Sequence, residues 1–472
     1  MSLRKTIIVL ILLALVGGYA LYSSIGTRPP AIPKLLGVDA KDIAQIELRS
    51  PTGDVVVERG KDGLWKITKP AAFKADQNAV NTLAQGISDA LLNSTVEEKP
   101  DNLAPFGLDP PRVVITVTLK DGRTMPSILV GSKTPVGYSD YVKLSDKPAV
   151  LLTDDSFSAT VIKTDEDLRD HSLLAFPIDQ VQRLTLAKSG APTIVLDRNG
   201  DEWTITQPAH YKAEPIVVQA VLTTLAGLRS TDFVVDSTTT PAEYGLDQPS
   251  LVATVYIGKK GEQQSLIFGK NQLGRDGVYV QVAGQPSVET VMPGAVHGID
   301  RTVNQLRDKT LLAFDPADVF RVDAHTPMED YVLARVPKSG AWTIDFDNKT
   351  QSADAIKVED FLDELRYLKG QAIIAEPMKD PASYNLARPP IDYKLYDSSG
   401  KMIGEVKLAE KAELAESSAP ITPSAAESSS WLATSSAGTA VYAVDSYDYT
   451  QINRTAYDLG YGATPVATAT PG

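Results

Sequence analysis

A seven-residue stretch, Trp65-Lys66-Ile67-Thr68-Lys69-Pro70-Ala71, recurs 138 residues later as Trp203-Thr204-Ile205-Thr206-Gln207-Pro208-Ala209. When residues 42–176 are laid on residues 180–314 without a gap, 33 of the 135 positions are identical. Self-similarity at one fixed spacing is the signature of a repeated structural unit. The sequence therefore contains a duplicated domain.

A third and more diverged copy follows the first two. Trp342-Thr343-Ile344 lies 139 residues after Trp203, and Tyr384-Asn385-Leu386 lies 140 residues after Tyr244-Gly245-Leu246. Three copies agree with a length of 472 residues, because a globular domain has about 150. We therefore expect three tandem repeats.

Each copy combines short strands with one amphipathic helix. Alternating or β-branched runs such as 113–119 and 141–144 predict strands, and Asn199-Gly200 and Asp121-Gly122 are hairpin signals between such runs. The expected fold class is α+β, with a mostly antiparallel sheet packed against one main helix in each copy. The apolar residues at helical spacing are Val80, Leu83, Ile87 and Leu91, then Val218, Val221, Leu222, Leu225 and Leu228, then Val358, Phe361, Leu362, Leu365 and Leu368.

The N-terminal segment predicts a membrane anchor. Residues 6–27 carry no charge, and as a helix they would extend about 33 Å, enough for a hydrocarbon core of ~30 Å. Arg4 and Lys5 precede this run, so the positive-inside rule keeps the N-terminus in the cytoplasm and sends the rest across the bacterial inner membrane. The alternative is a cleaved signal peptide, but Tyr19-Ala20-Leu21-Tyr22 is a poor cleavage context.

These observations predict the organisation of the chain. We expect a transmembrane anchor at 1–27, a Pro-rich stalk at 28–40, repeat domains at 41–176, 177–314 and 315–460, and a disordered tail at 461–472. The third domain carries an insertion at about 409–439, rich in Ala, Ser, Glu, Thr and Pro, which we expect to be disordered. Residues 315–472 hold 14 basic and 24 acidic residues, so the third copy is the acidic one.

Two repeated features have both structural and functional interpretations. The turn Phe106-Gly107-Leu108 recurs with Gly245 and then Asn385, which predicts a left-handed backbone conformation under a buried ring rather than an aromatic ligand platform. Trp65, Trp203 and Trp342 are expected in the cores rather than on a sugar-binding surface.

Leu168-Arg169-Asp170 and Leu306-Arg307-Asp308 close the first two copies. An Arg and an Asp repeated at a junction predict a local ion pair or helix-end contact between neighbouring domains, with anion binding as the alternative. The third copy lacks a clean equivalent, although Asn453-Arg454 is near the expected place.

Composition excludes several kinds of chemistry. The chain has no Cys, four scattered His and a net charge of −13, which argues against thiolate sites and against nucleic-acid binding. No nucleophile or metalloprotease motif occurs. We therefore predict no enzyme activity and no catalytic, cofactor-binding or metal-binding residue. A carboxylate pair assembled only in space would be the exception.

The run Gly63-Leu64-Trp65-Lys66-Ile67-x-x-Pro70, Ala75-Asp76 at a helix start and the turn at Phe106 resemble an uncharacterised bacterial domain family, in three copies over residues 35–460. That family is often encoded beside gliding-motility-type ABC transporter components. The third copy departs from its pattern at Asn385 and lacks the Leu-Arg-Asp. The resemblance implies a membrane-anchored extracytoplasmic accessory protein.

Three functions follow from these interpretations. The leading hypothesis is a scaffold of an ABC-type transport or cell-envelope system, which binds a transporter permease or auxiliary membrane proteins and contacts the bilayer through residues 6–27. The alternative is a ligand-binding module for envelope polysaccharide or another secreted substrate, and the third is an envelope enzyme.

Overall fold

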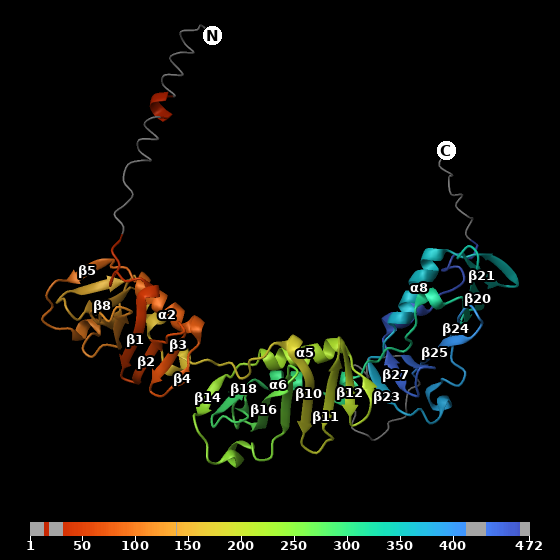
Figure 1. The fold of residues 1–472 in the computed structure, drawn as a ribbon. Coiled ribbons are helices and arrows are strands. Elements are labelled where there is room, and N and C mark those ends of the chain that lie inside the picture. The colour runs from red at the N-terminus through yellow and green to blue at the C-terminus, as the bar shows by residue number, and fades with distance from the viewer. Residues whose placement is uncertain (1–13, 18–31, 138, 412–430, 463–472) are drawn as a thin grey trace, which may run out of the picture. The chain divides into compact units, whose positions relative to one another are not determined.

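The computed structural model describes residues 14–17, 32–137, 139–411 and 431–462 (Figure 1). The chain divides into two compact units. The first comprises Met1–Ser172 with Arg229–Val234, and the second comprises Leu173–Leu228 with Val235–Gly472. Within the described ranges no helix is long and apolar enough to cross a membrane. Most of the expected anchor lies outside those ranges, and residues 14–17 of it are helical.

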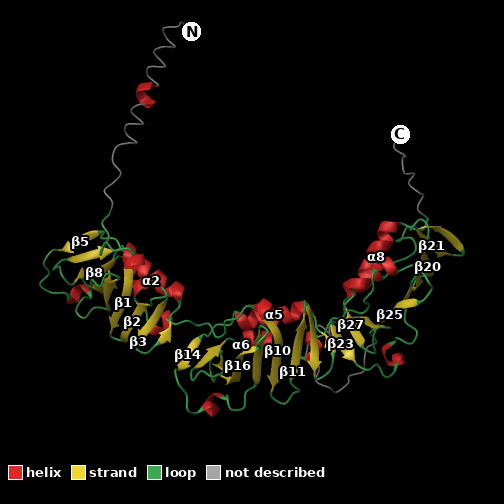
Figure 2. Ribbon diagram, viewed as in Figure 1, coloured by secondary structure: helices red, strands yellow, loops and turns green. Residues whose placement is uncertain are grey.

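The described residues form three antiparallel sheets of nine strands each, with the same strand order. In the first sheet that order is β4-β3-β2-β1-β6-β7-β8-β9-β5. The main helix of each copy follows the first edge strand in sequence and precedes the opposite edge strand. Figure 2 shows the three main helices, α2, α5 and α8, each beside its own sheet. The prediction of repeated, mostly antiparallel sheets with one main helix per copy is confirmed.

The first sheet buries one face under helix α2, whose first turn is capped by Asp76. The Asp76 carboxylate accepts hydrogen bonds from the backbone N–H groups of Asn78 and Ala79, which the helix itself leaves unpaired. The elements are β1 (Ile43–Ser50), β2 (Gly53–Arg59), β3 (Trp65–Lys69), β4 (Phe73–Lys74), α2 (Gln77–Asp89), β5 (Ser94–Glu97), β6 (Val113–Leu119), β7 (Ile128–Lys133), β8 (Asp140–Leu144), β9 (Val150–Thr153), α3 (Phe157–Val161) and α4 (Asp165–Leu168).

The second sheet repeats this arrangement with helix α5, which has Pro215 in its first turn. The expected tight turn joins two strands here, but its two loop residues are Gly200 and Asp201, because Asn199 pairs with Glu202. The elements are β10 (Val181–Lys188), β11 (Ile194–Asn199), β12 (Glu202–Gln207), β13 (Tyr211–Lys212), α5 (Pro215–Ala226), β14 (Asp232–Val235), β15 (Leu251–Ile257), β16 (Glu262–Asn271), β17 (Val278–Val282), β18 (Val288–Val291), α6 (Pro293–Ile299) and α7 (Val303–Leu306).

The third sheet has the same order around helix α8, which Asp354 caps. Its elements are β19 (Arg321–His325), β20 (Asp330–Arg335), β21 (Trp342–Phe346), β22 (Lys349–Ser352), α8 (Ala355–Tyr367), β23 (Ala372–Ala375), β24 (Ile391–Tyr396), β25 (Met402–Glu410), β26 (Trp431–Ser435), β27 (Val441–Val444) and α9 (Ser446–Ile452). Short 3-10 turns occur at Ala40–Asp42, Ala104–Phe106, Ile178–Gln180, Pro241–Tyr244, Pro316–Asp318 and Pro381–Tyr384.

The helical spacing in the sequence identifies the buried helix faces. Most of the predicted apolar positions are buried against their sheets. Leu91 is the exception, because helix α2 ends at Asp89 and Leu91 instead forms a backbone bridge with Lys34.

The copies begin earlier than their sequence similarity indicates. Leu35 and Val38 lie in the first core, so these residues are not part of a stalk at 28–40. Leu173 lies in the second core and Leu311 in the third, so the expected ends at 176 and 314 fall inside the following copy. The reason is that Leu35, Leu173 and Leu311 each donate a backbone hydrogen bond to one of the first two residues after the main helix of the copy that they begin.

The expected insertion and tail are only partly described. Strand β25 extends to Glu410 and strand β26 runs from Trp431 to Ser435, so residues 409–410 and 431–435 of the insertion predicted at about 409–439 belong to the sheet. Residues 412–430 of the insertion and 463–472 of the tail lie outside the described residues. Tyr461, which we expected in the tail, packs edge-on against Phe346.

Candidate functional site

The three repeated tryptophans are core residues. The exposed fractions of Trp65, Trp203 and Trp342 are 2%, 5% and 1%. The indole Nε1 of Trp65 donates a hydrogen bond of 2.9 Å to Asn81 Oδ1. The prediction of buried rings is confirmed, so these rings offer no face for a sugar to stack on.

The repeated turn has the predicted left-handed backbone. Its φ angle is +64° at Gly107, +71° at Gly245 and +59° at Asn385. A Cβ at Gly107 would lie 2.1 Å from Ser132 Oγ, which explains the glycine there. The ring at Phe106 is only half-buried, against the expectation. The buried side chain of the turn is the leucine that follows, because it faces the sheet.

The linkers after the first two sheets pair with the strand that enters the main helix. Arg169 forms an antiparallel bridge with Ala75, and Arg307 forms the same bridge with Ala213. Each linker therefore runs beside the start of the main helix of the copy that it leaves. This pairing points the two arginine side chains toward neighbouring rings.

In the first compact unit the Arg169 side chain lies between two rings. Its guanidinium carbon is 3.7 Å from the centroid of Phe73 and 3.8 Å from that of Phe233. The arginine is only 8% exposed. A cation held against aromatic faces is favourable when water is excluded. Phe73 comes from the first copy and Phe233 from strand β14, so this stack joins segments of two copies.

In the second compact unit Arg307 combines stacking with an ion pair. Its guanidinium carbon is 3.7 Å from the Tyr211 ring, and both terminal nitrogens donate to the carboxylate of Glu376. The hydrogen bond from Arg307 outweighs partial burial and lowers the pKa of Glu376. The predicted junction contact exists, but the ion-pair partner of Arg307 is Glu376. Asp308 instead accepts the backbone N–H of Thr310 at 3.0 Å.

A second ion pair repeats at the same places. Asp76, at the start of helix α2, lies 3.0 Å from Arg229, and Glu214, at the start of helix α5, lies 2.6 Å from Lys369. Burial alone would raise the pKa of Asp76, but hydrogen bonds from the Ala79 N–H and from Arg229 lower it. Each pair joins the start of one main helix to the residues after the next main helix, so the sequence spacing gives no sign of it.

The third copy has glycine at the position of the junction arginine. The backbone N–H of Asp354 donates to Leu459 O at 2.9 Å, and equivalent bonds occur in the other two copies. This aligns Gly460, with φ +101°, to Arg169 and Arg307. Arg454, which the sequence places near the expected position, lies six residues before Gly460.

The outward face of the third sheet differs from the other two at matched positions. Facing residues on two neighbouring strands form hydroxyl pairs in the first two copies, with Oγ distances of 2.9 and 2.8 Å. In the third copy they form an ion pair of 3.6 Å. The pairs are Thr116 with Ser127, Thr254 with Ser265, and Lys394 with Glu405.

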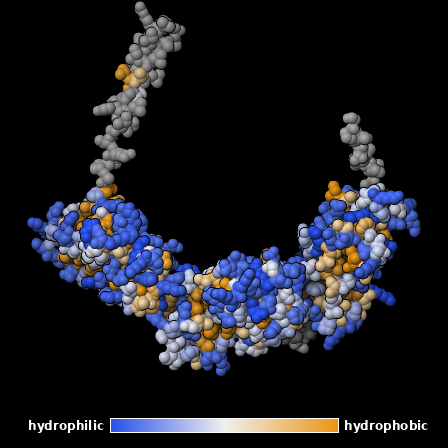
Figure 3. All heavy atoms as spheres, viewed as in Figure 1, coloured by the Kyte–Doolittle hydropathy of each residue, from blue (hydrophilic) through white to orange (hydrophobic). Residues whose placement is uncertain are grey.

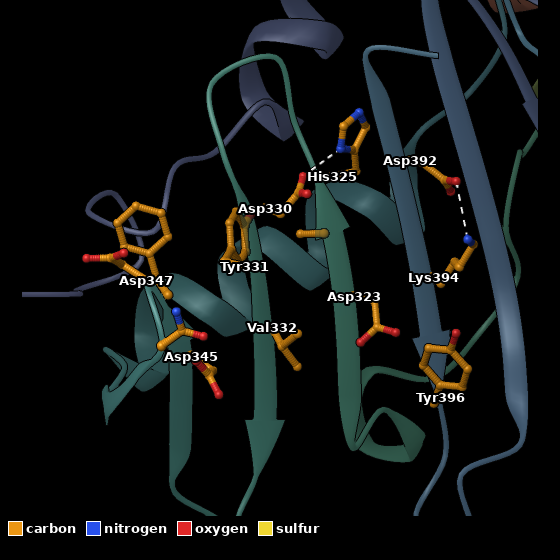
Figure 4. Close-up of a pocket in the computed structure, with 13 residues that line it drawn as sticks. Asp323, His325, Asp330, Tyr331, Val332, Asp345, Asp347, Asp392, Lys394 and Tyr396 are labelled. Carbon is orange, nitrogen blue, oxygen red and sulfur yellow. Dashed lines mark hydrogen bonds and ion pairs between the residues drawn. The ribbon is translucent and has the colours of Figure 1, made fainter. Parts of the chain in front are cut away.

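This face of the third sheet contains an open hollow of about 630 Å³, lined by four neighbouring strands (Figure 4). Most of its charged groups are carboxylates, which makes it suited to a cationic partner. Within the described residues no three His, Asp or Glu are arranged to hold a metal ion. The Asp, His and Lys residues that line the hollow are Asp323, His325, Asp330, Asp345, Asp347, Asp392 and Lys394.

Asp392 is the least solvated carboxylate that we find in the hollow. Its Oδ1 is buried and has no hydrogen-bond partner in the described part of the chain, and its Oδ2 lies 3.5 Å from Lys394 Nζ. Burial, and then the charge of Glu405, raise the pKa of Asp392 despite the nearby lysines. Backbone pairing places His325 opposite both Asp330 and Asp392, and His325 Nδ1 lies 2.5 Å from Asp330 Oδ1.

We expect Asp392→Asn to stabilise the chain by about 1 kcal/mol near neutral pH. A raised carboxyl pKa favours folding below the ordinary value of 3.8, and this contribution is lost as pH rises through the raised pKa. The uncharged amide avoids the loss, so the gain should vanish below pH 3.8. Urea unfolding at neutral pH and below pH 3.8 measures the gain in stability. The control is Asp345→Asn, because the Asp345 side chain is exposed. Equal stability of Asp392→Asn and wild type at neutral pH would contradict the prediction.

Sequence reasoning found the acidity of the third copy but none of the residues that form its hollow. The net excess of carboxylates was the only available signal, because strand β24 with Asp392 and Lys394 lies about 70 residues after the strand that holds Asp323. No catalytic, cofactor or metal residue was predicted, and the hollow was not foreseen.

Comparison with known proteins identifies the repeated domain. The sequence profile described as "Domain of unknown function (DUF4340)" matches residues 65–249 and again residues 203–389. Both matches begin at the repeated tryptophan and end at the proline after the repeated turn. No curated protein matches the chain. Since the two matches together span more than half of the sequence, the chain belongs to the family defined by the domain of unknown function DUF4340.

Proposed function

We propose that this protein is a membrane-anchored extracytoplasmic scaffold of an ABC-type transport or cell-envelope system, and that it acts by binding other proteins. Its partner would be a transporter permease or auxiliary membrane protein. The hollow on the third sheet would receive a basic segment of that partner.

The observation that carries this proposal is the exchange at matched sheet positions. Core, turn and strand order repeat in all three copies, whereas the Thr and Ser hydroxyl pair becomes Lys394 and Glu405 only in the third. Changing the outward face while keeping the core alters what the surface can bind without altering the fold. On the face shown in Figure 3 hydrophilic residues predominate and hydrophobic residues form scattered patches, which suits contact through charge.

The test returns two carboxylates of the hollow to the residues of the second copy. The variant Asp323→Thr/Asp345→Thr places threonine where the second copy has Thr185 and Thr206, and it should keep the circular dichroism and melting temperature of the wild type. Its recovery of the ABC permease encoded beside the gene should fall about tenfold, because the carboxylates that would contact a basic segment are lost. The matched control removes two exposed carboxylates of the second copy, Glu243→Thr/Asp276→Thr. Unchanged recovery of the permease, or no such permease among neighbouring genes, would contradict the proposal.

The anchor makes a separate prediction about extraction. Alkaline carbonate should leave the full chain in the membrane fraction, because a span of about 20 apolar residues resists it. Mass spectrometry of the mature protein should find an N-terminus before Ser24. Release into the soluble fraction, or a mature N-terminus beyond Ser24, would replace the anchor with a cleaved signal peptide.

A further inference from the structure

The edge strand that follows the main helix receives an arginine in two of the three copies. Strand β14 contributes Phe233 to the stack on Arg169, and Glu376, directly after strand β23, binds Arg307. In both cases the arginine belongs to the linker that precedes the copy. We call this edge, with the first residue after it, the receiving edge.

The first copy has the same edge, formed by strand β5 and Glu98. Strand β5 pairs with β9 through a bulge between Thr95 and Glu97, and β23 pairs with β27 through a bulge between Ile373 and Ala375. This register places Glu98 at the position of Glu376. The described chain shows no hydrogen bond or ion pair of the Glu98 side chain, and β5 is exposed along its whole length.

The sequence has no arginine for this edge at the repeated spacing. His171 O, Lys309 O and Pro33 O accept equivalent backbone hydrogen bonds after their main helices. The arginines lie two residues before His171 and Lys309. Two residues before Pro33 is Ala31, which has no cationic group.

We propose that the receiving edge of the first copy, residues 94–98, docks an extended segment of a partner protein that carries an arginine. The guanidinium would donate to the Glu98 carboxylate as Arg307 donates to Glu376, and the segment would lie along β5 beside Val96, which is 41% exposed. The proposal rests on the proposed function only in treating the chain as a protein-binding module.

A second copy of this chain does not fit as the occupant. The matching end of the third copy has Gly460 at the arginine position. It also has Gln351 at the place of the stacking rings Phe73 and Tyr211. The third copy therefore lacks both the cation and the aromatic face that fill this edge elsewhere.

Photocrosslinking in cells tests the proposal on the full chain. A benzophenone amino acid at Thr95 should give one protein adduct, whose crosslinked partner peptide contains an arginine. Glu98→Arg should lower the adduct yield at least about tenfold, because it sets two cations against each other. Changing the mapped partner arginine to glutamate should restore it. Glu243→Arg, an exposed acid on the second copy, is the matched control and should leave the yield unchanged.

A second variant removes only the charge of the acceptor. Glu98→Gln keeps the size and fold of the edge and should also lower the adduct yield, because a neutral amide no longer pairs with the guanidinium. Absence of a protein adduct, an adduct with lipid or with another copy of this chain, or a yield insensitive to Glu98→Arg would overturn the proposal. Asp323→Thr/Asp345→Thr should not change this adduct, so the two proposals fail independently.

Discussion

Replacing Arg307 with alanine is expected to lower the free energy of unfolding of the second compact unit by about 2–3 kcal/mol. The change leaves the Glu376 carboxylate without its ion-pair partner and removes the cation from the Tyr211 ring. The estimate is below that for a fully buried pair because the Glu376 side chain is 29% exposed. Urea unfolding and hydrogen exchange at strands β13 and β23 measure the loss.

The pH dependence of the same variant provides an independent measurement. The pKa of Glu376 is lowered from 4.5 in the folded chain, chiefly by the hydrogen bond from Arg307. A lowered carboxyl pKa contributes stability that is present above 4.5 and is lost as pH falls through the folded value. The difference between Arg307→Ala and the wild type should therefore be largest above pH 4.5. In more acidic solution it should shrink to the part that comes from the lost contact with the Tyr211 ring.

Two further variants separate a buried pair from a surface pair. Arg307→Met/Glu376→Leu should recover most of the lost stability, because an apolar pair replaces two compensated charges. Arg183→Ala removes a solvent-exposed pair with Asp197 in the same unit and should cost less than about 1 kcal/mol. If Arg307→Ala costs no more than Arg183→Ala, the junction contact is not structural.

Replacing Trp203 with alanine should cost about 3–5 kcal/mol in the second copy, the largest effect that we expect. The ring is 5% exposed and belongs to the second core, so its removal leaves a cavity that the sheet cannot close. Calorimetry and hydrogen exchange of β11 and β12 measure the effect. Leu273→Ala is the control, because that side chain is 99% exposed. If Trp203→Ala had the same melting temperature as the wild type, the ring would lie outside the core.

The local sequence pattern was sufficient to predict the repeat, the buried faces of the helices and the left-handed turn. Trp65 and its two equivalents are buried as expected, because the position belongs to a half-buried strand in every copy. Asn385 could replace glycine in the turn because asparagine tolerates positive φ. The start of the first copy was missed because the shared sequence there is only Leu35-Leu36, 138 residues before Leu173-Leu174, and two leucines are too short a match to mark a repeat. The backbone hydrogen bond that Leu35 donates after the helix makes the equivalence plain.

The candidate sites could not be found in the same way. The hollow takes Asp392 and Asp323 from strands about 70 residues apart, so no sequence window contains both. The receiving edge became visible only when Glu98 was aligned with Glu376 through sheet register.

By itself the sequence determined that three copies of one α+β unit follow an apolar N-terminal segment, with tryptophans in their cores and left-handed turns at fixed places. Those properties depend on residue periodicity and on backbone sterics, which are local. Only the tertiary structure decided that Arg307 binds Glu376, 69 residues away, rather than the adjacent Asp308. The tertiary structure alone also decided that Asp76 pairs with Arg229, 153 residues away. Such contacts depend on which strands and helix ends the folded sheets bring together, and many sequence spacings can place the same two charges side by side.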